Sequence, residues 1–345
     1  MKAYQDASLA PAKRAKALLE EMTLAEKVGQ LNQRLYGFRI YERKCVNGED
    51  TIELSEEFRQ EVEKYSGLGV LYGLYRADPW ADKDYETGLA GVLSKKAYNQ
   101  VQRYVLEHSR LGIPVMMSSE CPHGHQALDG YLLPVNLLAG ATFDPAMVRA
   151  AYRVSGRQLQ NMGVDFALMS MLDVLRDPRW GRSEECYSED PYLSARMAEA
   201  AVIGMQESGP EVVAKHFAAQ GEGTGGVNAS AARIGERELR EIHFPPAAAA
   251  IKAGAKGIMA AYNEIDGVYC HANRWLLNDV IRKEMGFDGI VMSDGVAIDQ
   301  LDSMTGDNVM SGALALQSGV DVGLWDEAFG KLEEAVRRGL VKEAQ

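Results

Sequence analysis

One carboxylate stands where a barrel enzyme would place a catalytic group. An apolar run that begins after Gly289 ends in Ser293, Asp294 and Gly295, which is typical of a buried parallel strand. In a barrel of alternating strands and helices, side chains at the carboxyl ends of strands face the site. Asp294 is therefore the first candidate for chemistry. The alternative is that Asp294 only caps the helix that follows.

Polar side chains also end four other apolar segments. They are Glu120, Arg182, Lys215, His216 and Tyr262. Such a rim suits a polyhydroxylated ligand, because each sugar hydroxyl both donates and accepts hydrogen bonds and charge-assisted bonds are the stronger ones. With Lys215 and Arg182 beside it, Asp294 would have a lowered pKa and stay ionised, as a nucleophile must.

Lys215 and His216 are neighbours on one predicted strand, and neighbouring side chains on a strand point to opposite faces. If both reach the ligand, the pleat must break there through a strained or cis peptide. Two duller interpretations stay open elsewhere. Arg179 or Arg182 would pair only with nearby carboxylates, and the two histidines of 123–125 would form loop hydrogen bonds, since no third metal ligand is spaced beside them.

Eight short apolar segments alternate with stretches long enough for helices, at 30–36, 69–72, 114–119, 166–172, 212–217, 257–262, 289–293 and 320–324. This alternation predicts a (β/α)8 TIM-like barrel with an irregular first strand. A doubly wound sheet would need a G-x-G-x-x-G turn, which is absent. Helices are expected at 9–28, 98–109, 145–162, 191–207, 236–253, 274–285 and 310–317. The polar stretch 36–66 is expected to be a loop and one helix.

The 345 residues are 46% hydrophobic and 25% charged, enough for one barrel-sized domain or two smaller ones. A net charge of −12 without a basic run argues against nucleic acid or an anionic membrane as partner. The first residues lack a signal-peptide core, so we expect a cytoplasmic protein. The four cysteines have no C-x-x-C spacing, and no metal or organic cofactor is indicated.

Taken together, these segments resemble glycoside hydrolase family 3, the family of β-glucosidases and β-xylosidases. The resemblance rests on residues 21–30, 120–125, 176–182, 188–191, 215–217, 262–263 and 293–294, in this order along the chain. It implies an exo-acting, retaining β-glycosidase, most simply a β-glucosidase, that releases the terminal non-reducing sugar of a small β-glucoside or oligosaccharide.

The resemblance also implies residue roles. Asp294 would be the nucleophile, and Arg182, Lys215 and His216 would hold hydroxyls of the terminal sugar. Glu120 would be the acidic sugar-binding residue. Tyr262 would lie beside the nucleophile and Met259 would line the pocket. These assignments are the substrate-binding set that the resemblance predicts.

Two departures from the family pattern concern specificity. Many members place Trp after the nucleophile, whereas this chain has Gly295, which predicts a more open aglycone side. Family β-glucosidases usually carry Asp at the position of Glu120. The extra methylene would shorten the pocket and favour a pentose, so a β-xylosidase is the alternative.

The third departure concerns the acid. A retaining glycosidase needs a second carboxyl roughly 5–5.5 Å from the first. The loop 218–230 lacks the His/Asp pair of the family's N-acetylglucosaminidase branch, and other members use a Glu from a second α/β domain. Glu222 and Glu264 are unfavoured substitutes, and the Gly-rich loop around Glu222 is not expected to hold its carboxylate in place. We expect a catalytic barrel at 1–325 and a terminal helix at 326–345 that leads to a second α/β domain, absent here. The chain alone would bind sugar but cleave it poorly.

Two rival functions remain at this point. Lys215 at a strand end is compatible with a Schiff-base lyase or aldolase, although adjacent carboxylates would keep its ammonium charged. A non-catalytic sugar-binding barrel is the other. The sequence leaves a homodimer open.

Overall fold

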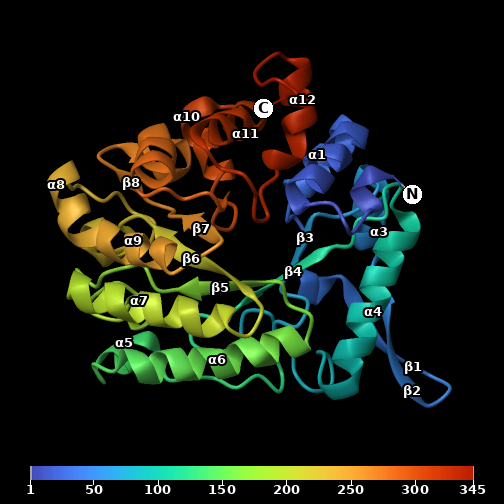
Figure 1. Cartoon of the computed structure of the whole chain (residues 1–345), viewed down its shortest axis with the longest axis horizontal. Helices are drawn as coiled ribbons and strands as arrows, with labels where there is room; N and C mark the ends of the chain where they lie inside the picture. Colours follow the sequence, from blue (N-terminus) through green and yellow to red (C-terminus); the bar gives the residue numbers. More distant parts are fainter. Residues whose placement is uncertain (1, 345) are drawn as a thin grey trace.

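A curled parallel sheet forms the centre of the computed structural model, which describes residues 2–344 (Figure 1). Its strands lie in the order β10-β7-β6-β5-β4-β3. They are β3 (Val70–Tyr72), β4 (Met116–Glu120), β5 (Phe166–Ser170), β6 (Glu211–Phe217), β7 (Gly257–Ala260) and β10 (Ile290–Met292). These short runs are largely buried, as the strands of a parallel sheet covered by helices must be. Six of the eight predicted strands are thereby confirmed.

The first and eighth predicted segments close the sheet without forming regular strands. Single parallel bridges join Tyr36 to Tyr72 and Met292 to Val322. The two closing segments bond to each other through Gly323 N to Leu31 O (2.9 Å) and Trp325 N to Gln33 O (2.9 Å). The prediction of regular strands at 30–36 and 320–324 is wrong, because each segment makes only a single isolated bridge to its neighbouring strand. The (β/α)8 class is confirmed.

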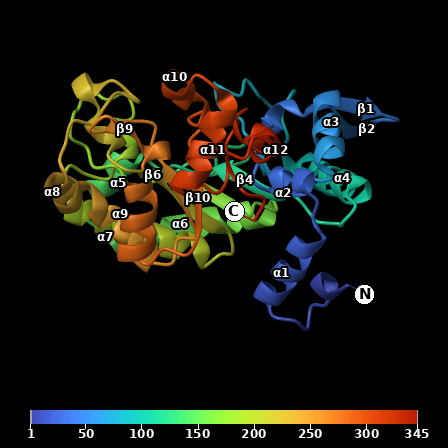
Figure 2. The same cartoon turned by 90° about the horizontal axis from the view of Figure 1, so that it is seen from above.

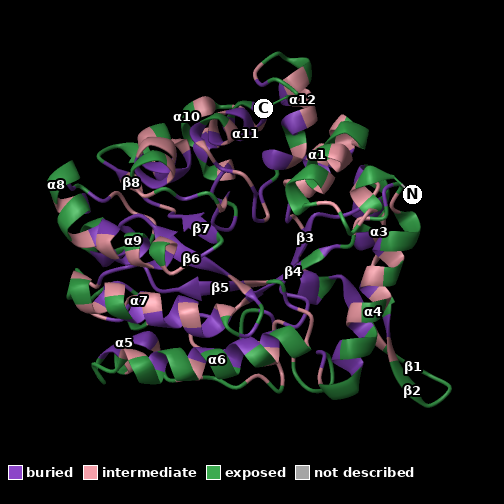
Figure 3. Cartoon of the chain, viewed as in Figure 1, coloured by how far each residue is buried: buried purple, intermediate pink, exposed green. Residues whose placement is uncertain are grey.

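Helices surround this sheet (Figures 1 and 2). The longer ones are α3 (Glu56–Tyr65), α4 (Gly91–His108), α6 (Pro145–Asn161), α7 (Pro191–Gln206), α9 (Phe244–Lys252), the π-helix η8 (Trp275–Glu284) and α11 (Asn308–Ser318). Aspartates 144, 190 and 307 cap α6, α7 and α11 by accepting backbone N–H bonds. The buried faces of these helices turn toward the sheet (Figure 3).

Several further helices and one short hairpin accompany them. They are α1 (Pro11–Glu21), α2 (Leu24–Gln30), α5 (Asn136–Gly140), α8 (Glu236–Glu238), the π-turn η6 (Leu239–His243), α10 (Asp302–Thr305), α12 (Leu332–Arg337) and the hairpin strands β8 (Glu264–Ile265) and β9 (Val268–Tyr269). The expected helix at 9–28 divides into α1 and α2 at Thr23, which forms the predicted capping box with Glu26.

A β-hairpin was not expected in the stretch 36–66. β1 (Tyr41–Val46) and β2 (Glu49–Leu54) pair antiparallel and extend away from the barrel beside α4 (Figure 1). Asn47 and Gly48 both have positive φ (53° and 80°), as a two-residue primed turn requires. The expected loop is therefore wrong, whereas the helix α3 is confirmed.

The predicted helix at 326–345 is also shorter than expected. α12 ends at Arg337, because Gly339 takes a left-handed conformation (φ 71°) and Leu340 N bonds back to Ala335 O (2.9 Å). Leu332 and Ala335 are buried in the main core, so α12 packs on the barrel.

Apolar side chains fill the interior of the ring of strands. The inner cluster contains Phe38, Tyr72, Ala81, Leu168, Val213, Met259, Met292 and Leu324, all buried. Burying each large one stabilises the fold by about 1.5–3 kcal/mol. Because this interior is packed, the side chains at the strand ends are approached from the carboxyl-end face. Among residues 2–344, no helix is long and apolar enough to span a bilayer.

Candidate active site

Asp294 follows β10 and is 8% exposed. Its Oδ1 accepts a bond from the amide of Gly295 (2.8 Å), and its own amide donates to Nε2 of His271 (3.2 Å). Oδ2 is buried and has no hydrogen-bond partner among the described residues. The carboxylate does not bond the first turn of a helix, so the capping interpretation fails. One carboxylate oxygen is left for a reacting group.

A network behind Asp294 fixes its strand end. Asp326 accepts bonds from Ser293 Oγ (2.6 Å) and from the amide of Ile298 (2.8 Å). Burial raises the pKa of Asp326 to about 7. Burial lowers the pKa of His271 to about 4, so this imidazole is neutral at pH 7 and its Nε2 accepts. The backbone on both sides of Asp294 is therefore anchored.

His216 lies next to Asp294, with 3.5 Å between Nε2 and Oδ2 of the carboxylate. Its Nδ1 lies 2.7 Å from Asp173 Oδ2, so Nδ1 carries the proton and Nε2 accepts from Arg182 Nη2 (2.9 Å). The Lys215–His216 peptide is cis, and the pairing of β6 with β7 shifts register there. The predicted break in the pleat is confirmed.

Lys215 and Glu120 form a buried ion pair, with 2.8 Å between Nζ and Oε2. Tyr72 donates to the other oxygen of Glu120 (3.1 Å). Burial alone would raise the pKa of Glu120, but the charges of Lys215 and Arg76 outweigh it and lower that pKa. The ammonium of Lys215 is thus held by a carboxylate, which disfavours a Schiff-base role.

Arg182 makes a bidentate pair with Glu185, at 2.6 Å and 2.9 Å. Burial opposes the charge of Arg182, but the bonds with Glu185 raise its pKa overall, and they hold the pKa of Glu185 far below its usual range. Arg179 instead pairs with Asp177 and is 71% exposed. The sequence offers Glu184, Glu185 or Asp190 as partners, which is correct for Arg182, whereas Arg179 pairs with Asp177. Only Arg182 also reaches the charged cluster at the strand ends, formed by Glu120, Lys215, His216 and Asp294 (the strand-end cluster).

Tyr262 and Met259 occupy different depths. Tyr262 donates to the carbonyl of Gly295 (2.8 Å). Burial, followed by the charge of Asp294, raises the pKa of Tyr262 well above its usual value, so the phenol stays protonated. Met259 has no exposed surface and packs in the inner cluster. Met259 therefore packs in the barrel interior, beneath the charged side chains at the strand ends.

The space beside Gly295 is occupied. A Cβ added at Gly295 would lie 2.5 Å from both Cε3 and Cζ3 of Trp325, far inside contact distance. The prediction that Gly295 leaves this side more open is wrong, because an indole from a distant part of the chain fills the volume.

Sequence reasoning overlooked several contributors. Tyr72 ends β3 and Asp173 follows β5, so their positions at strand ends were a usable signal. Arg76 donates to Tyr72. Glu185, which orients Arg182, was not overlooked, since it is one of the carboxylates that the sequence offers as a partner. No sequence signal marks His271, which lies in a 3-10 turn after a hairpin.

Two other predicted sites have structural roles. Nε2 of His125 bonds Ser119 Oγ (2.9 Å), and burial lowers the pKa of His125 to about 4. No metal-binding cluster occurs in the part of the chain that the structure describes. Glu222 lies 3.2 Å from Arg176 Nε and 3.4 Å from His243 Nε2. It is held in place, contrary to expectation.

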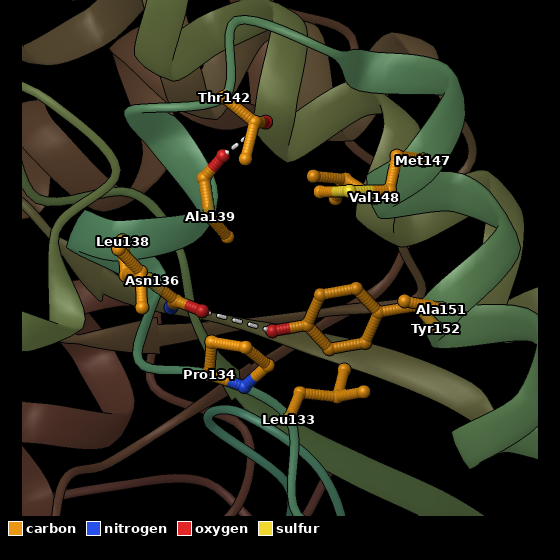
Figure 4. Close-up of a pocket in the computed structure, with 10 residues that line it drawn as sticks. All are labelled: Leu133, Pro134, Asn136, Leu138, Ala139, Thr142, Met147, Val148, Ala151 and Tyr152. Carbon is orange, nitrogen blue, oxygen red and sulfur yellow. Dashed lines mark hydrogen bonds between the residues drawn. The ribbon is translucent and has the colours of Figure 1, made fainter.

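A cavity of about 230 Å³ lies between α5 and α6 (Figure 4). Its lining residues are Leu133, Pro134, Asn136, Leu138, Ala139, Thr142, Met147, Val148, Ala151 and Tyr152. None is ionised near neutral pH. We assign the site to the strand-end cluster, because catalysis of polar bonds needs positioned charge.

Comparison with known proteins finds relatives over nearly the whole length of the chain. A putative beta-xylosidase of Formosa agariphila is 32% identical over 350 residues, covering 98% of this chain and 44% of the relative. The periplasmic beta-glucosidase of Salmonella typhimurium is 31% identical, covering 95% and 39%. The chain spans less than half the length of these curated relatives.

Solved structures give the same result. The b-glucosidase EmGH1 from Erythrobacter marinus superposes with a TM-score of 0.85 at 32% identity, covering 99% of this chain and 44% of that one. The beta-glucosidase from Listeria innocua in complex with glucose gives 0.81 at 28% identity, covering 96% and 44%. The model of the glycosyl hydrolase family 3 N terminal domain matches residues 23–345. This chain belongs to glycosyl hydrolase family 3.

Proposed function

We propose that this barrel is the nucleophile-bearing part of a retaining, exo-acting β-glycosidase, with a terminal β-linked glucose as the sugar. One observation carries the proposal. Asp294 Oδ2 is buried and unpartnered, and it lies inside a ring of paired charges at the strand ends. A buried carboxylate oxygen without a partner costs free energy. The unpartnered Oδ2 of Asp294 is best explained by a reacting group of a substrate that contacts this oxygen.

In the proposed reaction Asp294 Oδ2 attacks the anomeric carbon, and the bond from that carbon to the leaving oxygen breaks. The glycosyl-enzyme ester is then hydrolysed by water, which restores the carboxylate. His216 lies 3.5 Å from Asp294 Oδ2, and Arg182 bonds His216. The Lys215–Glu120 pair supplies both donors and acceptors for hydroxyls. The rigid, charge-paired arrangement limits the reorganisation needed as charge develops.

Leaving-group protonation needs a second carboxyl group in its acid form. Glu222 is unsuited, because its contacts with His243 and Arg176 lower its pKa. We propose that the acid comes from outside the barrel, from a second α/β domain. The greater length of the relatives supports this. The barrel alone would then cleave unactivated glycosides slowly.

The sugar itself has one alternative. Glu120 carries one methylene more than Asp, and the relatives include enzymes named as beta-xylosidases as well as beta-glucosidases. Both observations favour testing xylose beside glucose. A cytoplasmic location remains a prediction from sequence alone, and the sequence leaves a homodimer open.

The test uses an activated substrate and azide. We would incubate the chain with 2,4-dinitrophenyl β-glucoside or β-xyloside and identify the product by NMR. Dinitrophenolate leaves without an acid, and azide replaces water at the second step without a base. A retaining mechanism predicts the β-glycosyl azide, whereas an α-azide or a lack of product would overturn the proposal.

A further inference from the structure

An aromatic cluster borders the strand-end site where the ring of strands closes. It consists of Tyr36, Phe38, Tyr72, Trp80 and Trp325. Trp325 stacks on Tyr36 (4.6 Å, 27°), meets Tyr72 edge-on (4.7 Å, 88°) and lies 5.4 Å from Trp80. The indole is therefore the centre of this cluster, fixed by rings on several sides.

Trp325 also touches the residue after the proposed nucleophile. The atom positions that a side chain at Gly295 would take are filled by the indole of Trp325. Both Trp325 and Val296 have left-handed backbones (φ 62° and 61°), which costs each roughly 1–3 kcal/mol and is most often retained at functional sites. The indole Nε1 is buried without a partner. This local geometry is not what stability alone would favour.

Exposure increases along the cluster toward solvent. Tyr72 is fully buried, and its hydroxyl donates to Glu120. Trp325 and Tyr36 are half-buried, and Trp80 is 47% exposed. Because the interior of the barrel is packed, a glycoside must enter from the carboxyl-end face, with its terminal sugar at Asp294 and its leaving group toward solvent. The exposed end of the cluster lies on that outward side.

We infer that Trp325 is a specificity-determining residue that contacts the leaving group. Its indole lies where a side chain at position 295 would lie, and it can do so because residue 295 is Gly. The ligand class is a pyranose or aryl leaving group, whose apolar face suits an indole. The inference rests on the proposed function of Asp294. Residues 295 and 325 thus act as a pair, because a side chain at position 295 would exclude the indole of Trp325 from its place.

The test compares two reagents that carry the same sugar. The 2,4-dinitrophenyl 2-deoxy-2-fluoro-β-glucoside has an aromatic leaving group, whereas the corresponding glucosyl fluoride has none. Both label the nucleophile without an acid, and the rate is followed by intact mass. Trp325→Ala is expected to slow labelling by the dinitrophenyl reagent about tenfold, because the variant binds this reagent more weakly before the reaction. Labelling by the fluoride stays within about twofold of wild type. Trp325→Phe is intermediate.

A double-mutant cycle tests the pairing. Gly295→Ala places a Cβ on the indole and slows the dinitrophenyl reagent, but in the Trp325→Ala background the same change has little further effect. Gly235→Ala is the control, since nothing lies within 4 Å of its added Cβ.

The outcomes separate the two proposals. The inference would be overturned if Trp325→Ala and Trp325→Phe slowed labelling by the two reagents equally, or slowed labelling by neither reagent, while Asp294 is still labelled. A wild-type chain that neither reagent labels would overturn the proposed function and the inference with it.

Discussion

The strand-end cluster and the cavity between α5 and α6 differ in a way that indicates where function resides. The cavity holds about 230 Å³ of space and a Tyr152–Asn136 hydrogen bond, without a charge (Figure 4). The cluster instead buries Glu120, Lys215 and Asp294, and almost every polar atom has a partner. Buried charges are costly unless paired, whereas the lining of this cavity holds no charge that needs a partner. Concentrated charge, more than empty space, therefore marks the site.

The strongest test of this contrast removes the carboxylate of the strand-end cluster whose Oδ2 has no hydrogen-bond partner among the described residues. Asp294→Asn should lower labelling by the fluoro-sugar more than about 1000-fold, because an amide is not a nucleophile. The melting temperature should stay close to wild type, since Oδ2 makes no hydrogen bond. Asp288→Asn, on the exposed surface, is the control. Retained labelling of Asp294→Asn would assign the nucleophile elsewhere.

The second test breaks one buried pair. Lys215→Met leaves Glu120 buried without its ammonium, which should cost roughly 3–5 kcal/mol of the free energy of unfolding. The pKa of Glu120 should rise accordingly. Adding Glu120→Gln to Lys215→Met should restore much of the stability in urea denaturation, but not sugar binding. Full recovery of binding by the double variant would show that the pair is only structural.

The third test concerns acid. The pKa of His271 falls from 6.5 to about 4 in the folded chain. Between these values the unfolded state binds more protons, so stability decreases as the pH falls through that window. His271→Gln should recover about 2 kcal/mol near pH 4.5 relative to wild type, measured by urea denaturation at pH 7 and pH 4.5. An unchanged pH dependence would mean that His271 titrates normally.

The smallest effect on chemistry is expected in the cavity. Tyr152→Phe removes a hydroxyl that bonds Pro122 O (2.8 Å) and Asn136 Oδ1 (3.0 Å). It should lower the free energy of unfolding by about 1–2 kcal/mol and leave the labelling rate unchanged. A labelling rate that falls as far as in Lys215→Met would erase the distinction between the two regions.

Much of the barrel was predictable because its strands are short apolar runs followed by polar or Gly residues. The pairing of the two closing segments, 30–36 and 320–324, was not predictable, since it depends on the turned backbone at Trp325 rather than on a local pattern. The hairpin at 41–54 did carry a local signal in Asn47 and Gly48, a strong hairpin dipeptide.

The site divides in the same way. Residues at strand ends, such as Glu120, Lys215 and Asp294, were found because topology gathers strand ends at one face. The relation between Gly295 and Trp325 was not, because thirty positions of sequence separate them and only the tertiary fold places them in contact. A missing side chain at one position does not predict which residue fills its place.

The most direct test of the account is peptide mapping of the chain after reaction with 2,4-dinitrophenyl 2-deoxy-2-fluoro-β-glucoside, beside the xylose analogue. The activated leaving group separates the nucleophile from any acid that lies outside the barrel. We predict one added sugar, on the peptide that contains Asp294, and the faster analogue would name the sugar. An adduct on another carboxylate, or an unmodified chain with both analogues, would contradict Asp294 as the nucleophile.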